Sequence, residues 1–274
     1  MILLVDCGAT KAVWCAADEN RCWEVLMPGI NFAHSSAEEM EFRLREAAKE
    51  FQRPVNHIWF YGAGLVSGKM VEDLQALLED CFPGADAHCA SDMVGAARAA
   101  CGKKPGIAAI LGTGANTCQW DGERIGRKIP SGGFIIGDEG SAAVLGRLFI
   151  TDFLKDQVPA EVAKAFREQF PCDYPAIVKN VYGSEAPARY LGSLAPFLLP
   201  YYGKDQYVTD LVQANFRGFF ERTILRYDRL PLGVVGGFGY ACRDILTEMA
   251  REYDVPISTF LNSPMEGLLL YHGV

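Results

Sequence analysis

The sequence predicts an α/β protein of two domains, in which the second domain repeats the architecture of the first. The chain has 274 residues and is 50% hydrophobic, which suits a globular protein with apolar surface for two domains. A short apolar run, a turn of small residues and a second β-prone run occur at residues 4–10 and again at residues 110–116. The stretch most typical of a linker, residues 102–106, lies between the copies. We therefore place the domains at residues 1–103 and 104–274.

The first domain is expected to begin with three antiparallel strands and to continue with alternating helices and strands. The strands are the apolar run that ends at Asp6 and two β-prone runs on either side of a turn-rich tetrad. Amphipathic spacing predicts the helices. The expected strands are residues 1–5, 12–17, 22–27, 57–61 and 86–90, and the expected helices are residues 38–51, 70–82 and 93–101.

The second domain is expected to repeat the opening strands and to carry a helix-rich block. Asp138 or Glu139 is expected to cap its first long helix, because an acidic side chain stabilises a helix N-terminus. The expected strands are residues 107–111, 117–120, 232–235 and 256–260; the expected helices are residues 142–154, several between 160 and 227, residues 241–253 and a terminal helix after Ser263.

The composition excludes several classes of function. The formal net charge is −8 and no block of basic residues occurs, so a nucleic-acid or anionic membrane surface is not expected. No apolar run approaches the ~20 residues of a membrane span, and the N-terminus lacks the basic region of a signal peptide. The nine cysteines are scattered singly, which is typical of reduced thiols in a cytoplasmic protein. The four histidines are also dispersed, so no histidine-rich metal site is expected.

The first turn of the chain is compatible with two structures. It reads Asp6-Cys7-Gly8-Ala9-Thr10-Lys11. Alone, it could be an ordinary hairpin turn. A glycine turn after a strand can also bring backbone N–H groups close to a phosphate, and Asp6 could hold Mg²⁺ beside it. The similar turn Gly112-Thr113-Gly114-Ala115-Asn116 favours the phosphate-binding interpretation.

An ordered set of motifs resembles one known family. The set comprises the turn at Asp6, Asp92 at a strand–helix junction, the turn at Gly112, Gly137-Asp138-Glu139-Gly140-Ser141, and Gly236-Gly237-Phe238-Gly239. It resembles the BadF/BadG-type ATPase family and its N-acetylglucosamine kinase-like sugar kinases, within the superfamily of acetate and sugar kinases, heat-shock ATPases and actin. The resemblance implies two duplicated ribonuclease H-like (actin-like ATPase) domains with mixed five-stranded sheets flanked by helices, and an ATP cleft between them. It also implies a helical insertion in the second domain and a final helix that packs back on the first.

The resemblance also implies the role of each matching residue. Asp6 would hold Mg²⁺, directly or through a water molecule. The residues expected to bind ATP and its phosphates are Asp6, Gly8, Thr10, Lys11, Gly112, Thr113, Gly114, Gly236 and Gly237. The residues expected to bind the sugar are Asn31, Asp92, Ala115, Asn116, Gly133 and Asp138.

Asp92 is the expected catalytic residue. Its position before the small-residue helix 93–101 by itself favours an N-cap. The family places its catalytic aspartate at such a junction, where a carboxylate can accept the proton of the attacking hydroxyl. Capping and catalysis are compatible roles for one side chain.

The resulting expectation is a cytoplasmic, homodimeric, ATP- and Mg²⁺-dependent amino-sugar kinase. Its substrate would be N-acetylglucosamine or a related N-acetylhexosamine, phosphorylated at the 6-hydroxyl; the sequence does not choose among acetylated, lactylated and free amino sugars. One alternative is an ATPase that activates a radical dehydratase, but the single cysteines offer no paired ligand set for its iron–sulfur cluster. A non-catalytic sugar sensor is the other alternative, and the presence of Asp92 argues against it.

Overall fold

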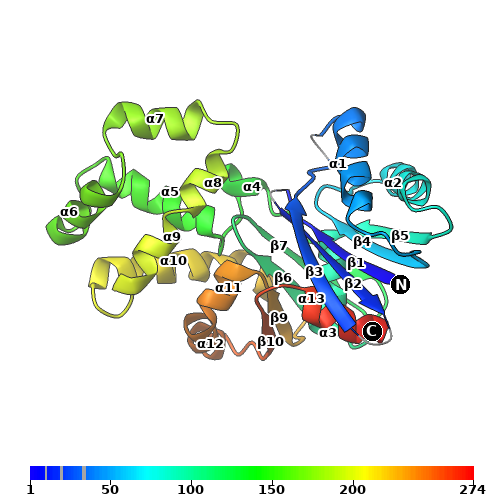
Figure 1. Cartoon of the computed structure of the whole chain (residues 1–274). Coiled ribbons are helices and arrows are strands. Elements are labelled where there is room, and N and C mark those ends of the chain that lie inside the picture. The colour runs from blue at the N-terminus through cyan, green and yellow to red at the C-terminus, as the bar shows by residue number, and fades with distance from the viewer. Residues whose placement is uncertain (10, 19–20, 33–34) are drawn as a thin grey trace. The chain divides into compact units, whose positions relative to one another are not determined.

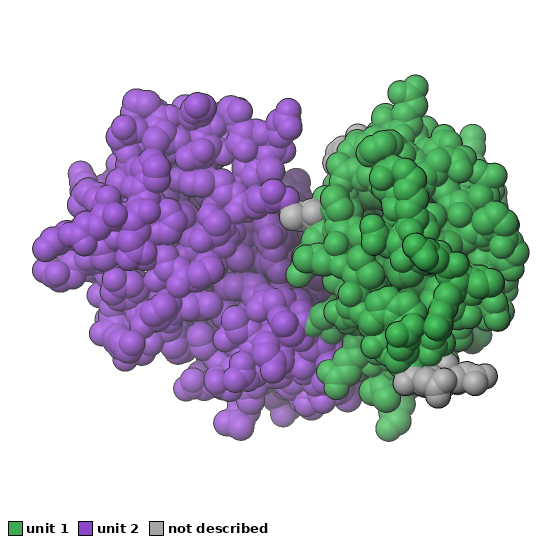
Figure 2. All heavy atoms as spheres, viewed as in Figure 1, with its two compact units in different colours: residues 1–105, 120–125, 263–274 green, residues 106–119, 126–262 purple. Residues whose placement is uncertain are grey.

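The computed structural model describes residues 1–9, 11–18, 21–32 and 35–274 (Figure 1). The chain forms two compact units, coloured separately in Figure 2. Unit 1 comprises residues 1–105, 120–125 and 263–274, and unit 2 comprises residues 106–119 and 126–262. In the described ranges, no helix combines the length and the apolar character that crossing a bilayer requires.

Unit 1 contains a five-stranded mixed sheet with the order β3-β2-β1-β4-β5. The strand β2 is antiparallel to β1 and β3, whereas β1, β4 and β5 are parallel to one another. The C-terminal ends of these three parallel strands therefore lie together, and we call them the unit 1 edge. The strands are β1 (Ile2–Cys7), β2 (Lys11–Asp18), β3 (Arg21–Pro28), β4 (His57–Gly62) and β5 (Asp86–Ser91).

Helices cover both faces of the unit 1 sheet. Consecutive residues of β1, whose side chains point to opposite faces, are therefore both buried. Leu3 and Val5 belong to a core that includes α1 and α2 residues. Leu4 instead packs with Met265 of the terminal helix α13. The helices are α1 (Ala37–Lys49), α2 (Gly68–Cys81), α3 (Asp92–Cys101) and α13 (Met265–His272).

Unit 2 contains a second five-stranded sheet, with the order β8-β7-β6-β9-β10. Counted along the chain, its strands have the same order as those of unit 1, and β6, β9 and β10 are parallel. The prediction of two duplicated α/β sheets is therefore confirmed. The C-terminal ends of β6, β9 and β10 form what we call the unit 2 edge. The strands are β6 (Gly106–Leu111), β7 (Ala115–Trp120), β8 (Ile125–Arg127), β9 (Leu232–Val235) and β10 (Ile257–Leu261).

The helices of unit 2 pack around a large apolar cluster that contains many aromatic rings, among them Phe149, Phe166 and Phe197. The helix expected at residues 241–253 begins at Arg243, and the preceding residues Gly237–Ala241 form a separate short helix, α11. The helical segments are α4 (Gly133–Ile136), α5 (Ala142–Phe153), α6 (Ala160–Gln169), α7 (Tyr174–Tyr182), α8 (Pro187–Gly192), α9 (Ala195–Leu198), η1 (Leu199–Tyr201), α10 (Gln206–Arg222), η2 (Ile224–Arg226), α11 (Gly237–Ala241) and α12 (Arg243–Glu252).

The N-terminus of α5 corrects one sequence prediction. Neither Asp138 nor Glu139 caps this helix. The N-cap is Ser141, whose Oγ accepts a hydrogen bond from the N–H of Val144 at 3.2 Å. The reason is that an N-cap stands directly before the first helical residue, which is Ala142, while the carboxylates of Asp138 and Glu139 have other partners.

Candidate active site

Asp6 lies at the unit 1 edge, close to the position where β5 leads into Asp92. In the sheet register Asp6 is opposite Tyr61, which is in turn opposite Ala90. Burial and, to a smaller extent, the negative charge of Asp92 raise the pKa of Asp6 to about 6, and Lys11 opposes this shift. The structure thus brings together the carboxylates of Asp6 and Asp92, which are 86 positions apart in the sequence.

A backbone hydrogen bond closes the turn after β1. The N–H of Gly8 donates to the carbonyl of Lys11 at 3.0 Å. The Cys7 thiol is buried and accepts a hydrogen bond from the N–H of Ile30 at 3.4 Å. Burial raises the pKa of Cys7 to about 12, so this thiol is neutral and acts as a small apolar group. Thr10, also predicted for this turn, lies outside the described residues.

Asn31 is held at the same edge by hydrogen bonds of its two neighbours. Ile30 is joined to Cys7, and the N–H of Phe32 donates to the carbonyl of Ala63 at 3.1 Å. The N–H of Ala63 in turn donates to the carbonyl of Cys7 at 2.8 Å. The segment that carries Asn31 is therefore attached to the ends of both β1 and β4.

Asp92 is the first residue of α3, and it is not the N-cap. That position belongs to Ser91, whose Oγ accepts from the N–H of Val94 at 3.4 Å. The Asp92 carboxylate accepts from the N–H of Met93 at 2.7 Å. The helix lies close to β4 because Gly95 has no side chain; a Cβ there would lie 2.8 Å from Cγ of Tyr61. Since Ser91 caps the helix, capping does not by itself account for an aspartate at position 92.

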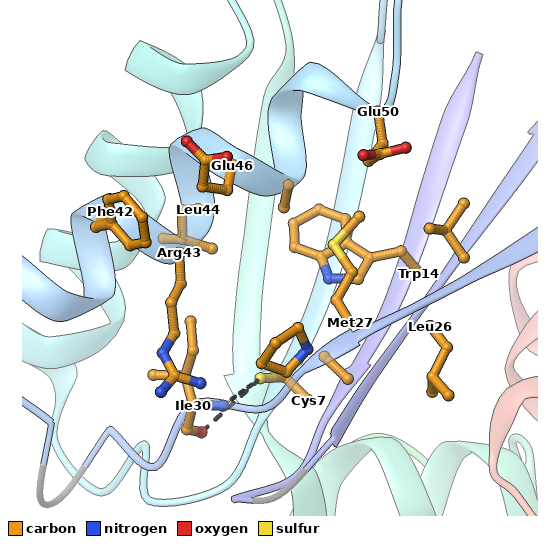
Figure 3. Close-up of a pocket in the computed structure, with 14 residues that line it drawn as sticks. Cys7, Trp14, Leu26, Met27, Ile30, Phe42, Arg43, Leu44, Glu46 and Glu50 are labelled. Atoms are coloured by element: carbon orange, nitrogen blue, oxygen red, sulfur yellow. Dashed lines mark hydrogen bonds between the residues drawn. The ribbon is translucent and has the colours of Figure 1, made fainter.

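A cavity of about 480 Å³ lies elsewhere in unit 1, between α1 and the strands β2 and β3 (Figure 3). Its lining is mainly apolar, with Cys7 and Ile30 at one end. Among the described residues, none of those predicted to bind ATP or sugar lines this cavity. The cavity is therefore separate from the residues predicted to bind ATP and sugar.

The turn after β6 is bound to the start of α5. Within the turn, the N–H of Gly112 donates to the carbonyl of Gly114 at 3.0 Å. The first two amides of α5, those of Ala142 and Ala143, donate to the carbonyls of Gly112 and Thr113 at 3.0 and 3.1 Å. The helix thus holds the predicted phosphate turn in a defined conformation.

Asp138 lies directly beside this turn and is mostly buried. A Cβ on Gly114 would lie only 3.0 Å from Asp138 Oδ2. Burial raises the pKa of Asp138, while hydrogen bonds from the N–H groups of Ala115 and Gly133 and from the Ser131 hydroxyl lower it. Three residues predicted to bind sugar, Ala115, Gly133 and Asp138, are therefore brought together. A shallow pocket beside them is also lined by Asn116.

Asn215, which the sequence analysis did not single out, supports the segment that carries Asp138. Asn215 of α10 is buried, accepts from the N–H of Gly140 at 2.9 Å and donates to the carbonyl of Ser141 at 3.0 Å. Arg222 of the same helix pairs with Glu139 at 3.1 Å. The sequence does hold a signal for this role. Asn215 lies with Val212 and Phe216 on the apolar face of a helix, and a buried amide side chain there needs polar partners.

Gly236 and Gly237 lie at the unit 2 edge next to the turn that begins at Gly112. The N–H of Gly236 donates to the carbonyl of Leu261 at 2.8 Å. Its φ is 115°, and a Cβ at this position would lie 2.6 Å from the carbonyl oxygen of Leu111. Only glycine fits this close approach, which leaves the backbone of the predicted adenosine loop uncovered.

Comparison with solved structures identifies the family. A protein of Porphyromonas gingivalis, provisionally assigned as an N-acetylglucosamine kinase, is 37% identical, with a TM-score of 0.92 over 99% of this chain and 98% of that one. The chain belongs to the sugar kinases of the BadF/BadG-type ATPase family. It is thus an ATP-dependent sugar kinase of the actin-like ATPase superfamily. No protein-family model and no curated protein matches the chain.

Two more distant structures have the same fold. A protein of Chromobacterium violaceum, also provisionally assigned as an N-acetylglucosamine kinase, is 20% identical to this sugar kinase, with a TM-score of 0.76 over 98% of both chains. A ROK-family glucokinase of Streptomyces griseus, in complex with glucose and AMPPNP, is 17% identical, with a TM-score of 0.60 over 98% of this chain and 97% of that one. At these identities the similarity concerns the fold alone.

Proposed function

We propose that this sugar kinase transfers the γ-phosphoryl group of ATP to the 6-hydroxyl of N-acetylglucosamine or a closely related N-acetylhexosamine. The observation that carries the proposal is the full-length similarity to the Porphyromonas gingivalis protein, at 37% identity. The convergence of Ala115, Gly133 and Asp138 beside the turn at Gly114 supports it, because a sugar needs several polar groups around its hydroxyls.

Asp92 is proposed as the general base. Phosphoryl transfer requires mainly positioning and charge stabilisation, and a carboxylate can accept the hydroxyl proton as the new bond forms. In the proposed step O6 of the sugar bonds to the γ-phosphorus, the bond from this phosphorus to the β,γ-bridging oxygen breaks, and ADP leaves. The O6 proton moves to Asp92. The influence of Asp92 on the pKa of Asp6 supports a shared site for both carboxylates.

Asp6 is proposed as the anchor for Mg²⁺, bound directly or through water. The residue fits this ion, because a divalent cation would offset both the burial of the carboxylate and its repulsion by Asp92. Bound Mg²⁺ would supply charge neutralisation at the β- and γ-phosphates. Gly8, Thr10, Lys11 and residues 112–114 are proposed to contact phosphate.

The remaining roles concern the sugar and the adenosine. Asp138, oriented by the amides of Ala115 and Gly133, is proposed to accept hydrogen bonds from sugar hydroxyls, together with Asn31 and Asn116. Gly236 and Gly237 are proposed to lie against the adenosine. A homodimer and a cytoplasmic location remain predictions from the family resemblance.

The test is a coupled assay of ADP release over a panel of N-acetylglucosamine, N-acetylmannosamine, N-acetylmuramic acid, glucosamine and glucose. We expect the highest kcat/KM with N-acetylglucosamine, and NMR of the product should show phosphate on O6. ADP release without sugar is the control for simple ATP hydrolysis. If none of the five sugars stimulates ADP release, the proposed substrate class is wrong.

A further inference from the structure

A cluster of two imidazoles and one carboxylate lies at the opposite edge of the unit 1 sheet from Asp6. His57 begins β4 and Asp86 begins β5, and the two residues are directly opposite each other in the parallel register. His88 is two residues beyond Asp86, so all three side chains leave the same face of the sheet. One potential ligand atom from each residue lies within 4.8 Å of the others.

The contacts within the cluster converge on one carboxylate oxygen. Oδ2 of Asp86 lies 3.0 Å from Nε2 of His88 and 3.6 Å from Nδ1 of His57. The three side chains are 59%, 40% and 50% exposed respectively. An entering ion would therefore meet three donors held on two adjacent strands, with solvent available for the remaining coordination positions.

A stack of rings holds His88 in place. Trp59, opposite His88 in the register, stacks on its imidazole with 4.2 Å between ring centroids. The ring centroids of Trp59 and His272 of α13 are 4.3 Å apart, and Nε2 of His272 is 2.7 Å from the hydroxyl of Tyr61. The stack restrains the His88 ring, which is the kind of support that surrounding residues give to a metal ligand.

The donor set indicates the class of ion. Two imidazole nitrogens and one carboxylate suit Zn²⁺ and neighbouring divalent transition metals, whereas Mg²⁺ prefers a shell of oxygens. We propose that His57, Asp86 and His88 form a binding site for a divalent transition-metal ion, with zinc as the best match. This site is distinct from the Mg²⁺ position proposed at Asp6 and does not depend on the proposed kinase substrate.

The thiols of the chain must be controlled for, because they also bind zinc. In unit 1 the sulfur atoms of Cys15 and Cys22 are 2.7 Å apart, which makes them a competing pair of ligands. Binding should therefore be measured in a Cys22→Ser background, with full-length protein that is free of an affinity tag and stripped of metal by a chelator.

Co²⁺ is the probe, because its visible absorption reports coordination, and Zn²⁺ is the competitor. We expect one saturable Co²⁺ site from which Zn²⁺ displaces the Co²⁺. His57→Gln, Asp86→Asn and His88→Gln should each weaken binding about tenfold or more, since each removes one of three ligands. Asp244→Asn is the matched control, because this carboxylate is 94% exposed on α12 and should leave the affinity unchanged.

Fluorescence locates the ion. Co²⁺ bound at His88 should quench Trp59, and Trp59→Phe should remove this quenching while Co²⁺ absorption persists with an affinity at most about 100-fold weaker. Thermal unfolding of the metal-free variants verifies that they fold. The proposal is overturned if the Cys22→Ser protein has no saturable Co²⁺ site. It is also overturned if a folded His57→Gln/His88→Gln double variant binds Co²⁺ as tightly as its parent.

Discussion

The two units share one sheet order but end their parallel strands in different chemistry. In unit 1, β1 carries Asp6 next to its C-terminal end and β5 leads into Asp92, and the charge of Asp92 raises the pKa of Asp6. In unit 2, the turn after β6 begins at Gly112 and the turn after β9 at Gly236, where a side chain does not fit. The parallel strands of unit 1 thus end in carboxylates, which can hold a proton or a cation, whereas those of unit 2 end in glycine backbone, which a phosphate or a nucleoside can approach closely.

Replacement of the proposed base tests the unit 1 half of this comparison and should have the largest effect. Asp92→Asn removes the proton acceptor but keeps the shape of the side chain, so kcat should fall by about 10²–10⁴. Calorimetric titration should find sugar binding largely retained. Asp244→Asn, on the surface of α12, is the control. Turnover near that of the wild type in Asp92→Asn would remove this residue from the role.

The second carboxylate, Asp6, should make the free energy of unfolding depend on pH. The pKa of Asp6 is raised from 3.8 in its reference state to about 6 in the folded protein, so the folded state binds the proton more tightly. The stability that Asp6 contributes should therefore be fully present below about pH 3.8 and be lost as the pH rises through about 6. At about 1.4 kcal/mol per pKa unit, the loss is on the order of 2–3 kcal/mol above pH 7.

Asp6→Asn isolates this contribution, because the amide does not titrate. In protein free of Mg²⁺ and ATP, the variant should be more stable than the wild type at pH 7.5 while its kinase activity is lost. Urea unfolding at pH 4.5 and pH 7.5 measures the difference. An unchanged pH dependence in the variant would show that Asp6 is not the group responsible.

The glycine loop of unit 2 provides the third test. Gly236→Ala forces a side chain into a backbone with φ 115° and against the carbonyl of Leu111, which should cost about 1–3 kcal/mol of stability and raise KM for ATP. Gly68→Ala is the control, since a Cβ on Gly68 meets nothing within 4 Å. Equal KM values for ATP in the two variants would argue against a nucleotide role for this loop.

Much of the fold could be predicted because its signals are local. Apolar runs that end in glycine turns, as at residues 4–10 and 110–116, predict strand–turn–strand units from adjacent residues alone. Helix ends were harder. Ser141 rather than Asp138 or Glu139 caps α5, because tertiary contacts with Ala115, Gly133 and Arg222 engage the two carboxylates.

The candidate site also has features that the sequence predicts and features that only the structure reveals. The sequence by itself determined which strand ends carry Asp6, Asp92 and the glycine turns, since each is part of a short contiguous motif. Only the tertiary structure brought Asn215 to the Asp138 turn, or joined His57 to Asp86 and His88. These contacts depend on helix docking and on strand register, which arise from burial summed over whole elements and leave no short pattern in the chain.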